Sequence, residues 1–104
     1  MKQIAEIKAT AMNRQRARTW LEKDFLVDFG FARHAPISIE FGDDAIVVTL
    51  DSEGPRKVAG RDRAGKKQVQ ILDICEPAAD RDKRWKGAQR VRVFAEIGRI
   101  VIKP

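Results

Sequence analysis

Basic side chains are the residues best suited to chemistry in this sequence, and they gather in two short polar stretches. Arg14, Arg16 and Arg18 alternate with uncharged residues, so on a β-strand all three side chains would point to one face. The second stretch, residues 56–67, carries six basic side chains and one acidic one, a net charge of +5. Arginine presents a two-pronged donor to a phosphate group, and lysine presents a point charge. Both stretches therefore predict contact with a phosphate-bearing polyanion.

The predicted phosphate-binding set comprises basic residues from both stretches. They are Arg14, Arg16, Arg18, Arg56, Lys57, Arg61, Arg63, Lys66 and Lys67. Gly60 and Gly65 lie among them, and glycine lets a backbone approach a phosphate closely. Affinity of this kind is mainly electrostatic and falls steeply as the salt concentration rises. The alternative interpretation is a solvated charged surface that binds no polyanion.

The sequence carries no recognisable catalytic signature. His34 is the only histidine and Cys75 the only cysteine, and no serine or acid stands at motif spacing from either. We interpret Cys75 as a small core residue. The Asp-Asp pair at 43–44 is typical of a turn, Asp80 and Asp82 would point to different helix faces, and the sequence has no P-loop, HExxH or CxxC motif. We therefore predict a protein that is not an enzyme and that needs no metal or cofactor.

Composition favours one compact globular domain. The chain has 104 residues, 43% of them hydrophobic and 35% charged, and its net charge of +6 favours a polyanionic partner. It contains no apolar run of the roughly 20 residues that a membrane helix needs, so we expect no membrane partner. The first ten residues lack the apolar centre of a signal peptide, and a single cysteine fits a reducing compartment. We expect a cytoplasmic protein.

Two segments of the chain share one hydrophobic pattern. The segments are ISIEFGDDAIVVTL at 37–50 and VRVFAEIGRIVIKP at 91–104, and they align without a gap at an offset of 54. Each alternates in the manner of a strand, turns, and continues as a denser apolar strand, with the second turn expected at Gly98-Arg99. Two hairpins in the same register indicate an internal repeat, although hairpins also resemble one another by physics alone.

The residues upstream of each hairpin repeat the same order of elements. We expect paired strands over 4–12 and 17–23, and again over 56–60 and 68–74, each pair with a basic tip. A short helix follows in each half, the first with Asp24 as its N-cap and an end near Gly30, the second with Pro77 in its first turn and an end at Gly87. Each half is therefore predicted to be strand–strand–short helix–strand–strand. The halves are 1–50 and 56–104, joined by a hinge at 51–55 within one compact domain.

Aromatic residues help to predict the core. Phe31 and Trp85 align at the same offset of 54, so we expect both to be buried core residues. Trp20 and Leu21 are neighbours on a predicted strand and must face opposite sides. One of these two should therefore be buried and the other partly exposed.

This pattern resembles the AbrB-type swapped-hairpin family, and within it the SymE-type toxins. The residues that carry the resemblance in the first half are Leu26, Gly30, Phe31, Ile37, Ile39 and Ile46–Thr49. In the second half, WKGAQRVRVFAEIGRIVIKP is similar to the closing pattern of the family. The chain departs from the family at ARHAP, where the usual glycine is replaced and Pro36 limits strand pairing.

The resemblance implies a fold, a partner and an activity. The fold would be a mainly β barrel with short helices, formed by two half-units that interleave hairpins, as a monomeric pseudo-dimer or a homodimer. Basic hairpin residues would bind double-stranded DNA, with RNA as the alternative, in a transcription regulator or a DNA-coating toxin. SymE-type toxins have also been proposed to attack RNA, so a ribonuclease is a further alternative, although the sequence supplies no convincing acid and base.

A protein partner is the alternative from a different functional class. Residues 24–55 carry seven acidic side chains and one basic one. Under this alternative they form the working face of an inhibitor or accessory factor, such as a phage-encoded one, that binds another protein. The acidic residues are Asp24, Asp28, Glu40, Asp43, Asp44, Asp51 and Glu53.

Overall fold

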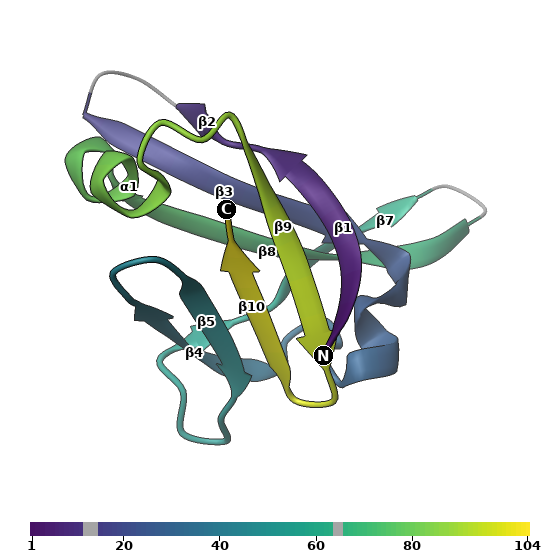
Figure 1. Ribbon diagram of the computed structural model, residues 1–104. Coiled ribbons are helices and arrows are strands. Elements are labelled where there is room, and N and C mark those ends of the chain that lie inside the picture. The colour runs from purple at the N-terminus through teal and green to yellow at the C-terminus, as the bar shows by residue number, and fades with distance from the viewer. Residues whose placement is uncertain (12–14, 64–65) are drawn as a thin grey trace.

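The structure is a computed structural model that describes the backbone of residues 1–11, 15–63 and 66–104, and the side chains of 1–9, 15–61 and 69–104. Within these residues the chain forms two antiparallel sheets and two short helices (Figure 1). The six-stranded sheet, here sheet A, has the order β1 (Lys2–Lys8), β9 (Arg90–Glu96), β10 (Arg99–Lys103), β5 (Ile46–Leu50), β4 (Pro36–Phe41), β6 (Arg56–Lys57). The four-stranded sheet, here sheet B, has the order β2 (Thr10–Ala11), β3 (Arg16–Lys23), β8 (Lys66–Pro77), β7 (Ala59–Arg63). The helices are η1 (Asp24–Phe29), a 3₁₀ helix, and α1 (Ala78–Trp85).

The prediction of a mainly β protein with short helices is confirmed, but the predicted closed barrel is wrong. Both sheets are open, with β1 and β6 at the edges of sheet A and β2 and β7 at the edges of sheet B. No helix in the described part of the chain is both long and apolar enough to cross a membrane.

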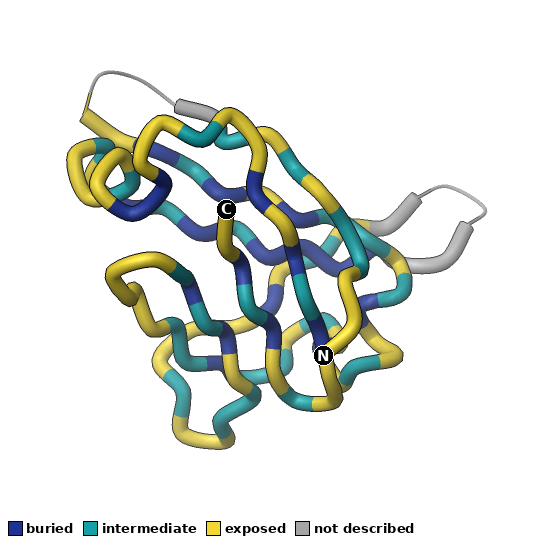
Figure 2. Tube along the Cα trace, viewed as in Figure 1, coloured by how far each residue is buried: buried dark blue, intermediate teal, exposed yellow. Residues whose placement is uncertain are grey.

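The core lies between the inner faces of the two sheets. In sheet A, alternate residues such as Ile46, Val48, Ile100 and Ile102 are fully buried, and Leu72 of sheet B joins the same cluster. Figure 2 shows buried segments alternating with less buried ones along many of the strands, whereas residues 69–72 of β8 are all buried. The inner faces of both sheets are therefore mainly apolar and their outer faces carry most of the charged side chains, although Val69 and Ile71 are buried on the outer face of sheet B, opposite Arg61 and Glu22.

Two segments of the chain, β1–β2 and β6–β7, each begin in sheet A and continue in sheet B, so the upstream hairpins differ from the prediction. β1 pairs with β9 of sheet A, and only the short β2 pairs with β3 in sheet B. In the same way β6 pairs with β4, and β7 pairs with β8. The crossings fall at Ala9, whose N–H donates to the carbonyl of Gln89, and at the buried Val58, whose N–H donates to the carbonyl of Ala35. The expected pairing of 4–12 with 17–23 is wrong for β1, which pairs with β9, because β3 is paired along its whole length with β8 on one side and with β2 on the other.

The strand orders of both sheets have a shared regularity. Each of the strands β1 to β5 can be exchanged with the strand whose number is five higher, so that β1 changes places with β6, β2 with β7, and so on. After this exchange the strand order of each sheet is the same order read from the other end. At the centre of sheet A, Val47 of β5 pairs with Val101 of β10, two residues that are 54 positions apart. Several residues that align in the two hairpins are buried alike, as in the pairs Ile37 and Val91 or Ile46 and Ile100, whereas Phe41 is exposed and its equivalent Ala95 is buried. The hairpins at 37–50 and 91–104 are confirmed, although the second turn lies at 97–98.

The 54-residue offset fails between β3 and β8. Ala17, Thr19 and Leu21 point inward from β3, whereas an offset of 54 would match Leu21 with Cys75. Cys75 lies on the outer side of β8, opposite Arg18, and is only half-buried. The prediction of Cys75 as a core residue is therefore wrong. The reason is that side chains alternate with a period of two, so a shift of one residue moves a side chain to the other face.

Each short helix ends where predicted and packs against a turn from the other half of the chain. Asp24 is the first residue of η1, not its N-cap, and the helix stops at Gly30 with a φ of +93°. Pro77 precedes α1, which ends before Gly87 with a φ of +81°. The N–H of Gly98, in the β9–β10 turn, donates to the carbonyl of Phe29 over 2.9 Å. Phe31 follows η1 and Trp85 is the last residue of α1, and both are buried as predicted.

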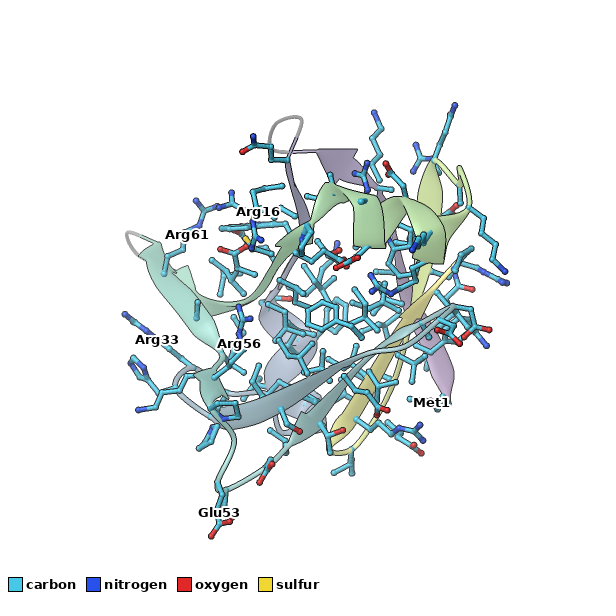
Figure 3. All side chains as sticks on the ribbon, turned by 90° about the vertical axis from the view of Figure 1, so that its left-hand side faces the viewer. Met1, Arg16, Arg33, Glu53, Arg56 and Arg61 are labelled. Carbon is cyan, nitrogen blue, oxygen red and sulfur yellow. The ribbon has the colours of Figure 1, made fainter. Side chains whose placement is uncertain are left out.

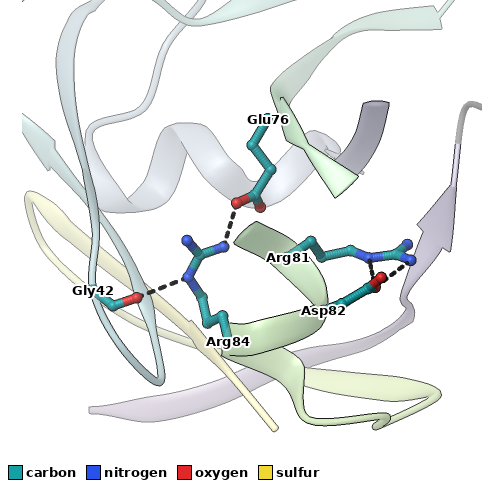
Figure 4. Close-up of polar contacts among 5 residues, drawn as sticks. All are labelled: Gly42, Glu76, Arg81, Asp82 and Arg84. Atoms are coloured by element: carbon teal, nitrogen blue, oxygen red, sulfur yellow. Dashed lines mark hydrogen bonds and ion pairs between the residues drawn. The ribbon is translucent and has the colours of Figure 1, made fainter. Parts of the chain in front are cut away.

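A buried ion pair joins α1 to both sheets (Figure 4). Arg84 Nη1 lies 2.5 Å from Glu76 Oε1, and Arg84 Nε donates to the carbonyl of Gly42 over 2.9 Å. The two charged side chains are 5% and 4% exposed, and the guanidinium lies over the rings of Phe41 and Trp85. Buried charges are tolerated only when they are paired, so this contact fixes the helix against β8 and against the β4–β5 turn.

The segment at 51–55 packs closely against the first hairpin. The N–H of Gly54 donates to the carbonyl of Asp51 over 2.8 Å, and the N–H of Asp51 donates to the carbonyl of Pro36. A Cβ atom added at Gly54 would lie 2.2 Å from the carbonyl oxygen of Ile37. The backbone contact with β4 therefore requires glycine at this position.

Replacing Arg84 with Met should lower the free energy of unfolding by about 3–5 kcal/mol, because Glu76 would remain as a buried unpaired charge. Adding Glu76→Met should restore much of that loss, since the charge is then removed. Urea denaturation measures both changes. Arg99→Met is the matched control, because Arg99 and Glu96 form a loose pair with both side chains 51% exposed, and it should cost less than about 1 kcal/mol. Equal losses for Arg84→Met and Arg99→Met would contradict the prediction.

Gly54→Ala should destabilise the fold by about 1–3 kcal/mol, because the new methyl group must displace the backbone of β4. The exposed neighbour Ser52 serves as the control, and Ser52→Ala should change stability by no more than about 0.5 kcal/mol. Thermal unfolding of the two variants beside the unsubstituted protein makes the comparison. A fully stable Gly54→Ala variant would show that the segment at 51–55 does not need this close contact.

Candidate nucleic-acid interface

The outer face of sheet B brings several predicted residues together. Arg16, Arg18, Trp20 and Glu22 alternate with the buried residues of β3 and so point away from the core. The two arginines therefore share one face, as the alternation predicted. We call this surface the arginine face, and define it by six residues from three strands. They are Arg16, Arg18, Trp20 and Glu22 of β3, Asp73 of β8 and Arg61 of β7.

Ion pairs hold two of these arginines against the sheet. Arg61 Nη2 lies 2.6 Å from Glu22 Oε2, and Arg18 Nε lies 3.0 Å from Asp73 Oδ1. The guanidinium of Arg18 also lies 5.1 Å from the ring centre of Trp20. These contacts orient the guanidinium groups along the sheet, yet Arg18 and Arg61 keep 38% and 57% of their side chains exposed. Such partly solvated pairs are weak, so a phosphate can compete with the carboxylate for the arginine.

The second basic stretch is divided between the two sheets. Arg56 and Lys57 form β6 at the edge of sheet A, and both are exposed. Arg56 nevertheless reaches sheet B, where its Nη2 donates to the carbonyl of Asp73 over 3.4 Å. Figure 3 shows Arg16, Arg56 and Arg61 on one side of the molecule, with Met1 on the other. The fold thus places arginines from β3, β6 and β7 around one surface.

Part of the predicted set lies outside the described residues. Arg14 falls in the undescribed segment 12–14. Arg63 pairs with Lys66 through the backbone, so the strands extend further toward the second tip than the sequence predicted. The side chains of Arg63, Lys66 and Lys67 are not among those described.

The two basic tips belong to opposite ends of sheet B. β3 and β8 are antiparallel, from Arg16 opposite Pro77 to Lys23 opposite Gln70. Arg16 at the start of β3 and Lys66 at the start of β8 therefore lie at opposite ends of sheet B (Figure 1). β8 has 12 residues, so at about 3.3 Å per residue it spans roughly 36–40 Å. The arginine face runs between the two tips.

Sequence reasoning missed two contributors to this surface. Trp20 is 39% exposed while Leu21 is 1% exposed, which confirms that one of the two is buried and decides which one. The alternation of Arg16, Arg18 and Trp20 in the sequence was the signal that could have found it. Arg33 comes from the loop before β4, and its side chain lies so close to Gly60 of β7 that an added Cβ there would meet it at 3.1 Å. No local signal predicts that contact, because the two residues meet only in the folded chain.

The acidic residues of the alternative hypothesis do not gather in the same way. Asp43 and Asp44 lie in the β4–β5 turn, whereas Asp51 and Glu53 follow β5 at the opposite end of that hairpin. Asp24 and Asp28 belong to η1, and Glu40 to β4. The acidic set is therefore distributed along the hairpin and η1.

Sheet A carries a second basic surface that is useful for comparison. Arg90, Arg92, Arg99 and Lys103 lie on the outer sides of β9 and β10. Arg92 and Lys103 approach the ring centre of the half-buried Phe94 to 5.7 and 5.1 Å. This surface lies outside the predicted set and provides charge-matched control positions.

Other kinds of site find little support in the geometry. Among the described residues, no three His, Cys, Asp or Glu side chains come together in a way that could hold a metal ion. A pocket of about 250 Å³ lies beside α1 rather than on the arginine face. Its lining residues are Phe41, Gly42, Asp43, Asp80, Lys83 and Arg84.

No protein-family model, curated protein or solved structure matches this chain. The resemblance to AbrB-type proteins therefore rests on the residues quoted above and stays a hypothesis.

The exposure of Trp20 predicts a simple spectroscopic result. The chain has two tryptophans, and Trp85 is only 3% exposed. Trp20→Phe should therefore shift the remaining emission to shorter wavelength and sharply reduce quenching by acrylamide, because a buried indole is shielded from water and from the quencher. The same variant in urea is the control, since unfolding exposes Trp85. Unchanged quenching in folded Trp20→Phe would show that Trp20 is covered.

Proposed function

We propose that this protein binds nucleic acid, holding phosphates on the arginine face and at the basic connections at either end of it. The observation that carries the proposal is the alignment of Arg16, Arg18 and Arg61 along one open sheet face between the two tips. Arginine forks match phosphate geometry, and an antiparallel sheet with one solvated face offers room for an extended ligand. The net charge of +6 acts in the same direction.

The length of sheet B supports the double-stranded DNA expected from the sequence. The span of roughly 36–40 Å along β8 is close to one turn of a DNA duplex, about 34–36 Å. Basic tips at the two ends could therefore contact phosphates about one turn apart. RNA, which offers the same phosphates, is the alternative partner.

We also propose the finer fold that the resemblance implies, with two AbrB-like halves that exchange strands within one chain. The reversed strand order of both sheets supports it, as does the packing of η1 against the β9–β10 turn. Under this proposal residues 1–50 and 56–104 are half-domains joined at 51–55, and the chain is a monomeric pseudo-dimer. A regulator or a toxin that coats DNA, rather than an enzyme, fits this arrangement.

Binding should show a steep salt dependence that depends on the arginine face. Fluorescence anisotropy with labelled duplex DNA, single-stranded DNA and RNA should show log K falling linearly with log salt. Arg16→Ala with Arg61→Ala should weaken binding and make the slope shallower by roughly 2, because each lost phosphate contact removes nearly one unit. Circular dichroism verifies that the variant is folded, since the Arg61–Glu22 ion pair is lost.

The charge-matched control is Arg90→Ala with Arg99→Ala on sheet A, which should leave most of the slope intact. Equal losses for the two double variants would indicate diffuse attraction rather than a site. Absence of binding to every nucleic acid at low salt would overturn the proposal and favour a protein partner.

A further inference from the structure

A large aromatic side chain lies at the middle of the arginine face. Trp20 is 39% exposed, whereas Trp85 in the same chain is 3% exposed. Single exposed apolar residues are common on protein surfaces, so exposure alone indicates no function. The surroundings of Trp20 are what distinguish it.

Cationic groups lie on both sides of Trp20 along the sheet. Arg18 and then Arg16 precede it on the same face of β3, at intervals of about 6.6 Å set by the rise of two strand residues. On the other side, Glu22 brings Arg61 from β7 onto the face through the 2.6 Å ion pair. The order along the strand is therefore two cations, an aromatic ring, and an ion pair that contains a further cation.

The face remains positive after its acids are counted. Among the six residues that define the face, Arg16, Arg18 and Arg61 contribute three positive charges and two carboxylates contribute two negative ones, a net charge of +1. The carboxylates are Glu22 and Asp73. Arg33 and Arg56 beside the face raise the net charge to +3. A ligand for this face must combine negative charge with a flat surface that can stack on an indole ring. Nucleic acid bases joined by phosphates have that combination.

The accessibility of the base surfaces separates single strands from duplexes. In a duplex the faces of the bases are stacked on one another, and a protein reaches only their edges in the grooves. In a single strand the bases can turn outward and stack on an aromatic side chain. The Arg18 guanidinium already lies 5.1 Å from the ring centre of Trp20, so a base would stack on the exposed part of the indole or take the place of that guanidinium. A single strand can offer its bases in this way without breaking base pairs.

We propose that the arginine face binds a single-stranded nucleic acid, with one base stacked on Trp20 and the neighbouring phosphates on Arg16, Arg18 and Arg61. This inference rests on the proposed nucleic-acid binding and specifies its ligand. It assigns a single strand that lies along β3 to the arginine face, and the duplex considered above is the competing ligand in the test.

The test uses four labelled ligands of about 12 units, a length within the range of about 4–16 nucleotides that one OB-fold domain covers in single-strand-binding proteins. The ligands are oligo-dT, oligo-rU, an abasic phosphodiester chain of the same length, and a blunt duplex. Oligo-dT and oligo-rU should bind more tightly than the abasic chain and the duplex at equal salt, and should quench the emission of Trp20 in the unsubstituted protein. The comparison of dT with rU decides whether DNA or RNA is preferred.

Trp20→Ala should weaken binding of the single strands by about 5- to 150-fold, the range found for removal of one stacked base. It should leave binding of the abasic chain unchanged, because the phosphate contacts remain. Trp20→Phe, which keeps an aromatic ring, should retain part of the affinity, whereas Phe94→Ala on sheet A should have little effect. Circular dichroism of each variant establishes that it is folded.

The outcomes separate the two proposals. One outcome is that Trp20→Ala binds the single strands as tightly as the unsubstituted protein does, and that the abasic chain binds as tightly as oligo-dT. In that case phosphate binding stands and base stacking is overturned. Tighter binding of the duplex than of the single strands, without quenching of Trp20, would also overturn the single-strand proposal alone. Failure of all four ligands to bind at low salt would overturn both.

Discussion

The fold depends on two strand pairings, β5 with β10 in sheet A and β3 with β8 in sheet B. Each pairing joins the first half of the chain to the second, so neither sheet exists without both halves. A unit of about 50 residues buries too little surface to be stable alone, whereas the combined chain encloses one core cluster with residues from both halves. Crossings at Ala9 and Val58 reinforce this dependence, because the strands on either side of each crossing belong to different sheets.

The β3–β8 pairing also builds the proposed site. It buries Ala17, Thr19 and Leu21, and by the same alternation it exposes the arginines and Trp20 of β3. Opposite them, β8 supplies Asp73, which orients Arg18, and the edge strand β7 brings Arg61 beside Glu22. The same backbone hydrogen bonds that close the core therefore set the spacing of the cations and the ring, which gives the surface a rigid support.

The short helices cover the space between the sheets by different means. Helix α1 is held by the buried Arg84–Glu76 pair and its bond to the Gly42 carbonyl, whereas η1 meets its turn through the backbone of Phe29 and Gly98. The charged contact is specific to the second half, since Gly30 stands where the offset of 54 would require the equivalent of Arg84. The two halves share a strand order but differ in their polar side chains. The β9–β10 hairpin is basic, for example, whereas the equivalent β4–β5 turn is acidic.

Local patterns in the sequence determined the elements of this protein, and only the tertiary structure decided their partners. Alternating apolar residues predicted the hairpins at 37–50 and 91–104, and alternating arginines predicted the shared face of Arg16 and Arg18, because each depends on neighbours a few residues apart. The burial of Phe31 and Trp85 was predicted from their alignment at the offset of 54. Local patterns did not predict four features of the tertiary structure. These are the pairing of β1 with β9, the outward position of Cys75, the exposure of Trp20 rather than Leu21, and the contact of Arg33 with β7. Strand alternation defines two faces but not which of them is buried, and that choice is made by the sheet that packs against the strand.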